Sequence, residues 1–250
     1  MLASLPMYER PETRDAHDRF WLLLRQRMVE HGVRAPLALT RPTEDLLSHW
    51  RQPDLLFSQT CGHPFRTCLR DQLRLIGTPD YRVDGCPSGY YRSILICRKE
   101  DGRQSLSDFN GARLAYNDSL SQSGYVAALH QARVSGIRLD PAMETGSHRL
   151  SLHAVRTGSA DIAAIDAVTW SILESWEDGV DGVRLIGMTD PSPGLPYVTA
   201  QHAWNSMLFD AAADAIEGLS DRDRRVLRLH GLVRITEQEY QQVPAARNLD

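Results

Sequence analysis

Short apolar runs alternate with amphipathic stretches of helical period along most of the chain. In the first quarter, residues 2–7 form a short apolar run that predicts a strand. They lead into residues 11–32, whose proline, early acidic residues and closing glycine favour a helix. Residues 36–40 predict a second strand, residues 42–52 a helix, and residues 53–62 an apolar strand that opens into a polar turn. This order is typical of two successive β-α-β steps.

The same alternation continues to the end of the chain. Strands are expected at 73–79 and within 89–101, where bulky and branched residues concentrate. The later segments follow in this order: a short capped helix at 105–111, a strand at 111–118, a helix at 124–136, a helix running into a buried strand at 151–166, a helix at 169–180, a strand at 183–190, a proline-rich connector at 191–200, and helices at 201–219 and 220–233. Such a sequence predicts an α/β protein with parallel or mixed sheets covered by helices, whose ligands bind at the carboxyl ends of strands.

Composition narrows the class of protein. The 250 residues are 42% hydrophobic and 24% charged, which is ordinary for a folded globular chain and allows one large domain or two lobes. The net charge of −4 offers no broad positive field, so we expect no nucleic-acid partner, and any anion must be bound by a local arrangement of donors.

Polar turns follow several of the expected strands, and one of them directly precedes a helix. Ser121 and Ser123 supply hydroxyls, and Gly124 allows close approach of a ligand to the backbone. A helix start carries unpaired N–H groups and about half a positive charge, so this turn fits a phosphate, phosphonate, sulfate or carboxylate. The plainer alternative is that either serine is only an N-cap.

Three further positions have similar alternatives. The turn from Ser58 to Gly62 offers hydroxyl and amide donors, or simply a capped turn. His148 stands at an expected helix start, where it would either donate to an anion or face solvent as a capping histidine. Asp166 ends the apolar run before a helix, where it would receive an ammonium or hydroxyl of a ligand, or cap the helix.

Signatures of catalysis and of metal binding are weak. The chain has no GxSxG, HExxH, Walker A or GxGxxG motif, and Cys61 beside His63 is a poor dyad. The spacing of its four cysteines matches no zinc site, and we expect reduced, mostly buried thiols. We therefore expect no catalytic residues, no metal and no cofactor.

The amino-terminal stretch MLASLPMYERPETRD has no basic start and no long apolar segment. It is typical of neither a signal peptide nor a membrane anchor, so we expect a cytoplasmic chain with no membrane insertion. If a leader was removed, the expected location becomes the periplasm.

An ordered set of segments resembles one protein family over nearly the whole chain. These segments are LPMYERPE, GYYRSILICRKED, LSDFNGARLAYNDSLSQSGY, GSHRLSLHAVRTGSADIAAIDAVTW and PSPGLPYV. They are similar to the phosphate/phosphonate type of ABC-transporter substrate-binding proteins, which have the type II periplasmic-binding fold. The resemblance implies two α/β lobes, each a mixed sheet flanked by helices, joined by two crossover segments. Lobe 1 would take residues 1–91 and 195–250, and lobe 2 residues 92–194.

The resemblance also implies a function and a binding site. The protein would capture a small anionic solute between the lobes by hinged closure, as a monomer, without a chemical step, and would serve an ABC permease. The ligand-binding residues implied are Tyr8, Ser58, Gln59, Thr60 and Tyr91 from the first lobe and its hinge, and Ser121, Gln122, Ser123, Gly124, His148 and Asp166 from the second.

Two alternatives to transport remain from the sequence. The first is an enzyme of the same fold acting on a small metabolite, with His148, Asp166 or Cys61 as acid, base or nucleophile. The second is a cytoplasmic ligand sensor that acts through another protein.

Overall fold

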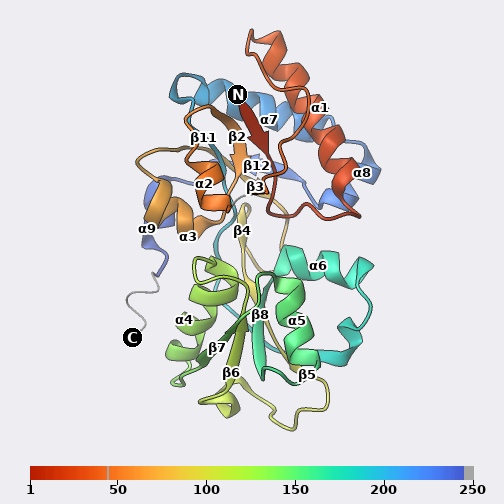
Figure 1. Ribbon diagram of the computed structural model, residues 1–250, viewed down its shortest axis with the longest axis vertical. Coiled ribbons are helices and arrows are strands. Elements are labelled where there is room, and N and C mark those ends of the chain that lie inside the picture. Colours follow the sequence, from red (N-terminus) through yellow and green to blue (C-terminus); the bar gives the residue numbers. More distant parts are fainter. Residues whose placement is uncertain (44, 245–250) are drawn as a thin grey trace. The chain divides into compact units, whose positions relative to one another are not determined.

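The computed structural model describes residues 1–43 and 45–244, and the chain in it divides into two compact units (Figure 1). The first unit contains Met1–Tyr90 and Pro193–Gln241, and the second contains Tyr91–Ser192. The described residues 242–244 group with the second unit. These ranges differ from the expected lobes by one or two residues at each internal boundary. Within the expected first lobe, residues 44 and 245–250 lie outside the described residues.

The first unit is built around a five-stranded mixed sheet. Its strand order is β1-β2-β11-β3-β12. Strands β1 and β2 are parallel, whereas β11 pairs antiparallel with both β2 and β3, and β12 pairs antiparallel with β3. The strands are β1 (Leu2–Ser4), β2 (Leu55–Gln59), β3 (Arg74–Asp80), β11 (Tyr197–Thr199) and β12 (Gly231–Val233).

Helices flank this sheet and bury two apolar clusters. The larger cluster joins α1 and α7 to the sheet through residues such as Phe20, Leu24 and Leu208, which are at most 1% exposed. The smaller one gathers Trp50, Phe65 and Tyr240 from α2, η1 and α9. The helices are α1 (Arg14–Glu30), α2 (Leu46–Trp50), α3 (Gly62–Pro64), η1 (Phe65–Leu69), η5 (His202–Trp204), α7 (Asn205–Glu217), α8 (Asp221–Leu227) and α9 (Glu237–Gln242).

The second unit has a five-stranded sheet of order β7-β6-β8-β5-β9. Strands β7, β6 and β8 are parallel, and β5 pairs antiparallel with β8 and β9. Its elements are β5 (Ser93–Arg98), η2 (Leu106–Phe109), β6 (Arg113–Tyr116), η3 (Gln122–Val126), α4 (Ala127–Val134), β7 (Asp140–Glu144), α5 (His148–Arg156), β8 (Ile162–Asp166), α6 (Ala167–Trp176), η4 (Val180–Gly182) and β9 (Val183–Met188).

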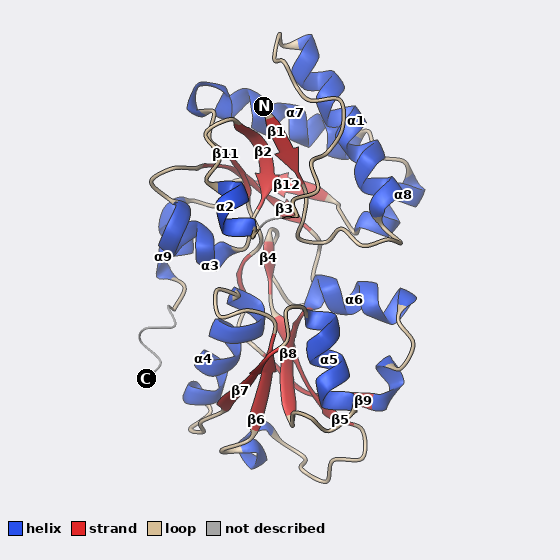
Figure 2. Ribbon diagram, viewed as in Figure 1, coloured by secondary structure: helices blue, strands red, loops and turns tan. Residues whose placement is uncertain are grey.

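Strand β8 shows why this sheet needs helices on both faces. Side chains of a strand point alternately to its two faces. Ile162 and Ala164 pack with α4, whereas Ala163 and Ile165 pack with α5 and α6, and all four are fully buried. Figure 2 shows α4 and α5 on opposite sides of this sheet. The unbroken apolar run in the sequence is therefore a strand buried on both faces.

The chain crosses between the units through two short strands that pair with each other, β4 (Tyr90–Tyr91) and β10 (Ser192–Pro193). The expected fold class, two α/β lobes of periplasmic-binding type with two crossover segments, is confirmed by this architecture together with the solved structures reported below.

Some local predictions were wrong. Residues 36–40 form no strand: the Thr40 N–H donates to the Ala3 carbonyl at 2.7 Å, but Leu37 is 77% exposed. The helix expected over 220–233 ends at Leu227, because Arg228 takes a left-handed conformation (φ 54°) and the chain then forms β12. The predictions also missed strand β7 and helix α9.

Over the described residues, no helix is both long enough and apolar enough to cross a membrane.

Candidate functional site

The carboxyl ends of three parallel strands meet at one edge of the sheet in the second unit. Each strand leads into a helix after a short turn: β6 into η3 and α4, β7 into α5, and β8 into α6. Three helix starts therefore lie along this edge, which is the usual ligand-binding edge of an α/β sheet. The anion-binding turn expected from the sequence lies here.

The helix after β6 begins with a wide turn. The Val126 N–H donates to the Ser121 carbonyl at 3.1 Å, five residues back, so the first turn is a π-turn, a feature frequent at functional sites. Ser121 is the N-cap, since its Oγ accepts the Gly124 N–H at 3.0 Å. The capping alternative is therefore correct for the Ser121 oxygen, but this bond does not use the hydroxyl hydrogen of Ser121.

Ser123 makes a direct contact with His148 from the next helix. Its Oγ lies 2.9 Å from His148 Nε2 and 3.4 Å from Ser121 Oγ. The Ser123 carbonyl accepts a hydrogen bond from Ser93 Oγ at 2.9 Å, which ties the helix start to β5. Ser121 and Ser123 are each only 5% exposed. The structure thus brings together three of the predicted residues, Ser121, Ser123 and His148, around Gly124.

The His148 ring is neutral near physiological pH. Burial lowers its pKa to about 4, and the nearby Ala164 carbonyl partly opposes this shift without forming a hydrogen bond to Nδ1. The residue as a whole is half-buried, but Nδ1 is closed off from solvent. Ser123 and His148 are therefore neutral hydrogen-bonding groups, and the His148 tautomer decides which of them donates.

Asp166 ends β8 and caps α6. Its Oδ1 accepts the N–H groups of Val168 at 2.7 Å and Thr169 at 3.0 Å, and the residue is 2% exposed. The structure therefore confirms its capping role. Its contact with the far end of a ligand stays a prediction.

In the first unit, Ser58 points into a buried polar network. Its Oγ lies 2.7 Å from Ser4 Oγ and accepts Trp50 Nε1–H at 3.2 Å, while Ser4 Oγ lies 2.8 Å from His49 Nε2. Ser4 and Ser58 are fully buried. The hydroxyl of Ser58 thus joins β1, β2 and α2, and its predicted role in ligand binding would have to be combined with this structural one.

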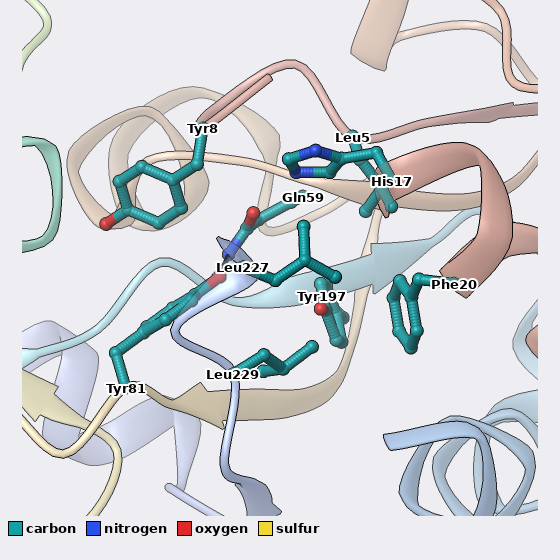
Figure 3. Close-up of a pocket in the computed structure, with 9 residues that line it drawn as sticks. All are labelled: Leu5, Tyr8, His17, Phe20, Gln59, Tyr81, Tyr197, Leu227 and Leu229. Carbon is teal, nitrogen blue, oxygen red and sulfur yellow. Dashed lines mark hydrogen bonds between the residues drawn. The ribbon is translucent and has the colours of Figure 1, made fainter. Parts of the chain in front are cut away.

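Tyr8 and Gln59 line the same small pocket in the first unit (Figure 3). Gln59 donates through Nε2 to Tyr81 Oη at 3.0 Å and to the Leu195 carbonyl at 3.1 Å, and the rings of Tyr8 and Tyr81 meet edge to face. Burial lowers the pKa of His17 in the same pocket. The remaining lining residues are Leu5, Phe20, Tyr197, Leu227 and Leu229. This lining is aromatic and apolar, with neutral polar groups.

The positions of three further predicted residues give no indication of a ligand contact. Thr60 is fully buried, with its N–H bonded to the Pro196 carbonyl at 3.1 Å and its hydroxyl 3.4 Å from the Cys61 carbonyl. Tyr91 and Gln122 are 2% and 3% exposed. Their contacts with a ligand stay predictions.

Sequence reasoning missed two residues beside the turn that is predicted to bind an anion. Ser93 supports Ser123 from β5, and Asn117, directly after β6, places its side chain against Gly124. Asn117 belongs to the polar turn before the helix, so its position was visible in the sequence. No sequence pattern marked Ser93 as part of the site, because its contact with Ser123 depends on the pairing of β5 with β8.

Among residues 1–43 and 45–244, no group of three or more His, Cys, Asp or Glu side chains is arranged to hold a metal ion. None of the four cysteines forms a disulfide bond in the described part of the chain. Only Cys97 is fully buried, whereas Cys61, Cys68 and Cys86 are partly exposed, so the expectation of mostly buried thiols was wrong.

Solved structures share this fold over nearly the whole chain. PhnD1 from Prochlorococcus marinus in complex with methylphosphonate has a TM-score of 0.71 and 13% identity, covering 99% of this chain and 96% of its own. A binding protein component of an ABC phosphonate transporter from Pseudomonas aeruginosa has a TM-score of 0.70 and 16% identity, covering 100% and 84%. A Xanthomonas citri protein bound to ATP has a TM-score of 0.69 and 16% identity, covering 99% and 94%. At such identities these likenesses show the fold.

No curated protein matches the chain in sequence. A family model does match, over residues 4–242, and it describes the periplasmic substrate-binding protein of phosphonate ABC transporters. Members of this family bind solutes for a permease. This finding favours a binding protein over the alternative of an enzyme on the same fold. The chain belongs to the family of phosphonate-type periplasmic substrate-binding proteins of ABC transporters.

Proposed function

We propose that the protein captures a small solute carrying a phosphate, phosphonate or similar oxyanion, and that the start of η3 in the second unit binds the anionic group. The observation that carries the proposal is the cluster of Ser121, Ser123 and His148 at the first turn of this helix. These groups lie at the carboxyl edge of the parallel strands, where the two serine hydroxyls adjoin the amino terminus of a helix.

Neutral donors are sufficient for this task. A helix start carries about half a positive charge and presents N–H groups that have no partner inside the helix. In a site closed off from water, hydrogen bonds to an ionised ligand are shorter and about twice as strong as those between neutral groups. The chain has a net charge of −4 and so has no overall attraction for an anion. It would bind an anion through local donors such as this helix start.

The pair formed by Ser123 and His148 adds a relay of hydrogen bonds. When Nε2 of the neutral ring carries its hydrogen, it donates to Ser123 Oγ, and the Ser123 hydroxyl hydrogen is available to the ligand. We infer that an oxyanion favours this tautomer, because it gives the anion one more donor. His148 would then act through Ser123 as well as by any direct contact.

The remaining assignments extend the proposal. Gln122 and Gly124 would contribute at the same helix start, and Asp166 at the other end of the ligand. Four residues of the first unit and one of the hinge remain predicted ligand contacts: Tyr8, Ser58, Gln59 and Thr60, and Tyr91. Family membership supports a small solute and a permease partner, and with them a periplasmic location. That the receptor acts as a monomer is part of the proposal.

The test is isothermal titration calorimetry with inorganic phosphate, methylphosphonate and aminoethylphosphonate. We expect binding of at least one of them, and a loss of about 3 to 6 kcal/mol in the double variant Ser121→Ala/Ser123→Ala, because two charge-assisted contacts disappear. Ser135→Ala is the matched control, since this serine is exposed at the far end of the same helix. Undiminished affinity in the double variant would return both serines to a purely structural role.

A further inference from the structure

Asn117 is held at the end of β6 with its side chain turned inward. Its carbonyl accepts the Gly146 N–H at 2.9 Å, so the main chain continues the pairing of β6 with β7 by one step beyond the strands. The side-chain oxygen, Oδ1, is inaccessible to solvent and has no hydrogen-bond partner among the described residues. Burying a carbonyl oxygen without a hydrogen-bond donor costs free energy. Such an oxygen beside a ligand site is therefore expected to have a structural role.

Asn117 Oδ1 occupies the space beside the backbone of Gly124. A Cβ built on Gly124 would overlap Asn117 Oδ1 and would lie 3.1 Å from Asn117 Cγ and 3.2 Å from His148 Cε1. Asn117 and His148 thus adjoin one point beside the Gly124 backbone, and the Asn117 amide fills the space that a side chain would need. Only glycine fits at position 124 while Asn117 keeps this position.

The groups around Asn117 Oδ1 are weak carbon donors. One Gly124 Cα–H takes the direction in which the overlapping Cβ would point, and His148 Cε1 lies 3.2 Å from that Cβ position. The imidazole Cε1–H is polarised because it stands between two ring nitrogens. Contacts of C–H with a carbonyl oxygen are weak but directional. They are consistent with the oxygen of the amide, rather than its NH₂, facing Gly124 and the ring.

We propose that Asn117 is a positioning residue for the anion site: its buried oxygen sets the Gly124 backbone and the His148 ring in the arrangement that presents Ser123 to the ligand. The inference rests on the proposed function of this helix start. Asn117 acts through its two neighbours and does not touch the ligand. Its amide dipole also directs negative charge toward the His148 ring, which stabilises a ring that becomes more positive beside a bound anion.

The first experiment is a double-mutant cycle on Asn117 and Gly124, with methylphosphonate affinity and thermal stability as readouts. We expect Asn117→Ala to weaken binding about fivefold to tenfold, the size of two lost C–H···O contacts. Gly124→Ala should be far more harmful in the wild-type background than in the Asn117→Ala background, because removing the amide makes room for the new methyl group. Equal harm in both backgrounds overturns the proposal.

A second measurement does not depend on binding. In the ¹H NMR spectrum of the unliganded protein, the His148 Cε1–H resonance should move upfield in Asn117→Ala and stay near its wild-type position in Asn110→Ala. Asn110 is the matched control, since it is exposed in the same unit and its Oδ1 accepts the Arg138 N–H at 3.0 Å. An unmoved His148 resonance in Asn117→Ala overturns the positioning role, even if Gly124→Ala fails to fold.

The two proposals fail in different ways. If the wild-type protein binds none of the oxyanions, the proposed function fails, whereas the NMR shift and the stability coupling still test whether Asn117 positions its neighbours. If the oxyanions bind but neither coupling nor shift is found, the proposed function stands and the role of Asn117 is rejected.

Discussion

Ser123 Oγ and His148 Nε2 lie 2.9 Å apart, although the two residues belong to different helices and are separated by 25 positions in the chain. The contact joins the helix that follows β6 to the helix that follows β7. Both ends of this hydrogen bond are neutral, because burial lowers the pKa of His148 to about 4.

The first prediction concerns substitutions of His148. Glutamine can still donate an amide N–H to Ser123, whereas alanine cannot. We expect His148→Gln to bind methylphosphonate more weakly than the wild type by about tenfold or less, and His148→Ala to lose more than that. Calorimetry on the three proteins checks the order. Equal affinities for the two variants would show that the hydrogen bond to Ser123 has no role in binding.

The second prediction concerns pH and stability. The pKa of His148 is lower in the folded chain than the ordinary value of 6.5, so the unfolded chain takes up its proton first as the pH falls. His148 therefore destabilises the fold progressively between about pH 6.5 and about pH 4, by up to about 3 kcal/mol. Urea unfolding across this range should give a shallower pH dependence for His148→Gln than for the wild type.

His63 sets the background for that measurement. Its pKa is also lowered to about 4, chiefly by burial and to a smaller extent by Arg66. Both proteins should lose stability in acid for this reason, so only the difference between them reports on His148. Parallel curves for the two proteins would contradict the prediction.

The third prediction separates structure from binding in the first unit. Ser58→Ala leaves Trp50 Nε1–H and the Ser4 hydroxyl without their shared partner, so we expect it to lower the free energy of unfolding by about 1 to 3 kcal/mol. Thr60→Val should leave stability nearly unchanged, because the Thr60 hydroxyl has only a long contact with Cys61. If Thr60 contacts the ligand, the same variant weakens binding, and calorimetry at a temperature where both variants are folded measures this.

The fourth prediction tests the two roles of Asp166. Asparagine is as good an N-cap as aspartate, so Asp166→Asn should keep the hydrogen bonds to Val168 and Thr169 and change the unfolding free energy little. If the carboxylate also faces an ammonium group, aminoethylphosphonate should lose affinity while methylphosphonate does not. A parallel change for both ligands would leave Asp166 as a cap alone.

The second unit was partly predictable because its central strand, β8, is buried on both faces. The run IAAI before Asp166 has no polar interruption, which is the pattern of a central strand covered by helices on each side. Strand β7 gives the opposite case. Four of its five residues are exposed and it contains Pro141, so neither periodicity nor composition marks it as a strand.

The candidate site was predictable only as far as local chemistry reaches. The serines and the glycine before a helix predict an anion-binding turn, and His148 lies at the next expected helix start. The inward direction of the Ser58 side chain could not be foreseen, since every residue of β2 is buried and the sequence gives no preference between its faces. Likewise, the approach of Asn117 to Gly124 depends on how the turn folds back on itself.

The position of β11 has a consequence for how the protein is made. This strand, Tyr197–Thr199, lies between β2 and β3, although it leaves the ribosome more than a hundred residues after them. The first sheet therefore cannot close until most of the chain has been synthesised, whereas the five strands of the second sheet form one uninterrupted stretch from Ser93 to Met188. Translation would thus complete the half that carries Ser123 and His148 while the amino-terminal half still waits for its central strand.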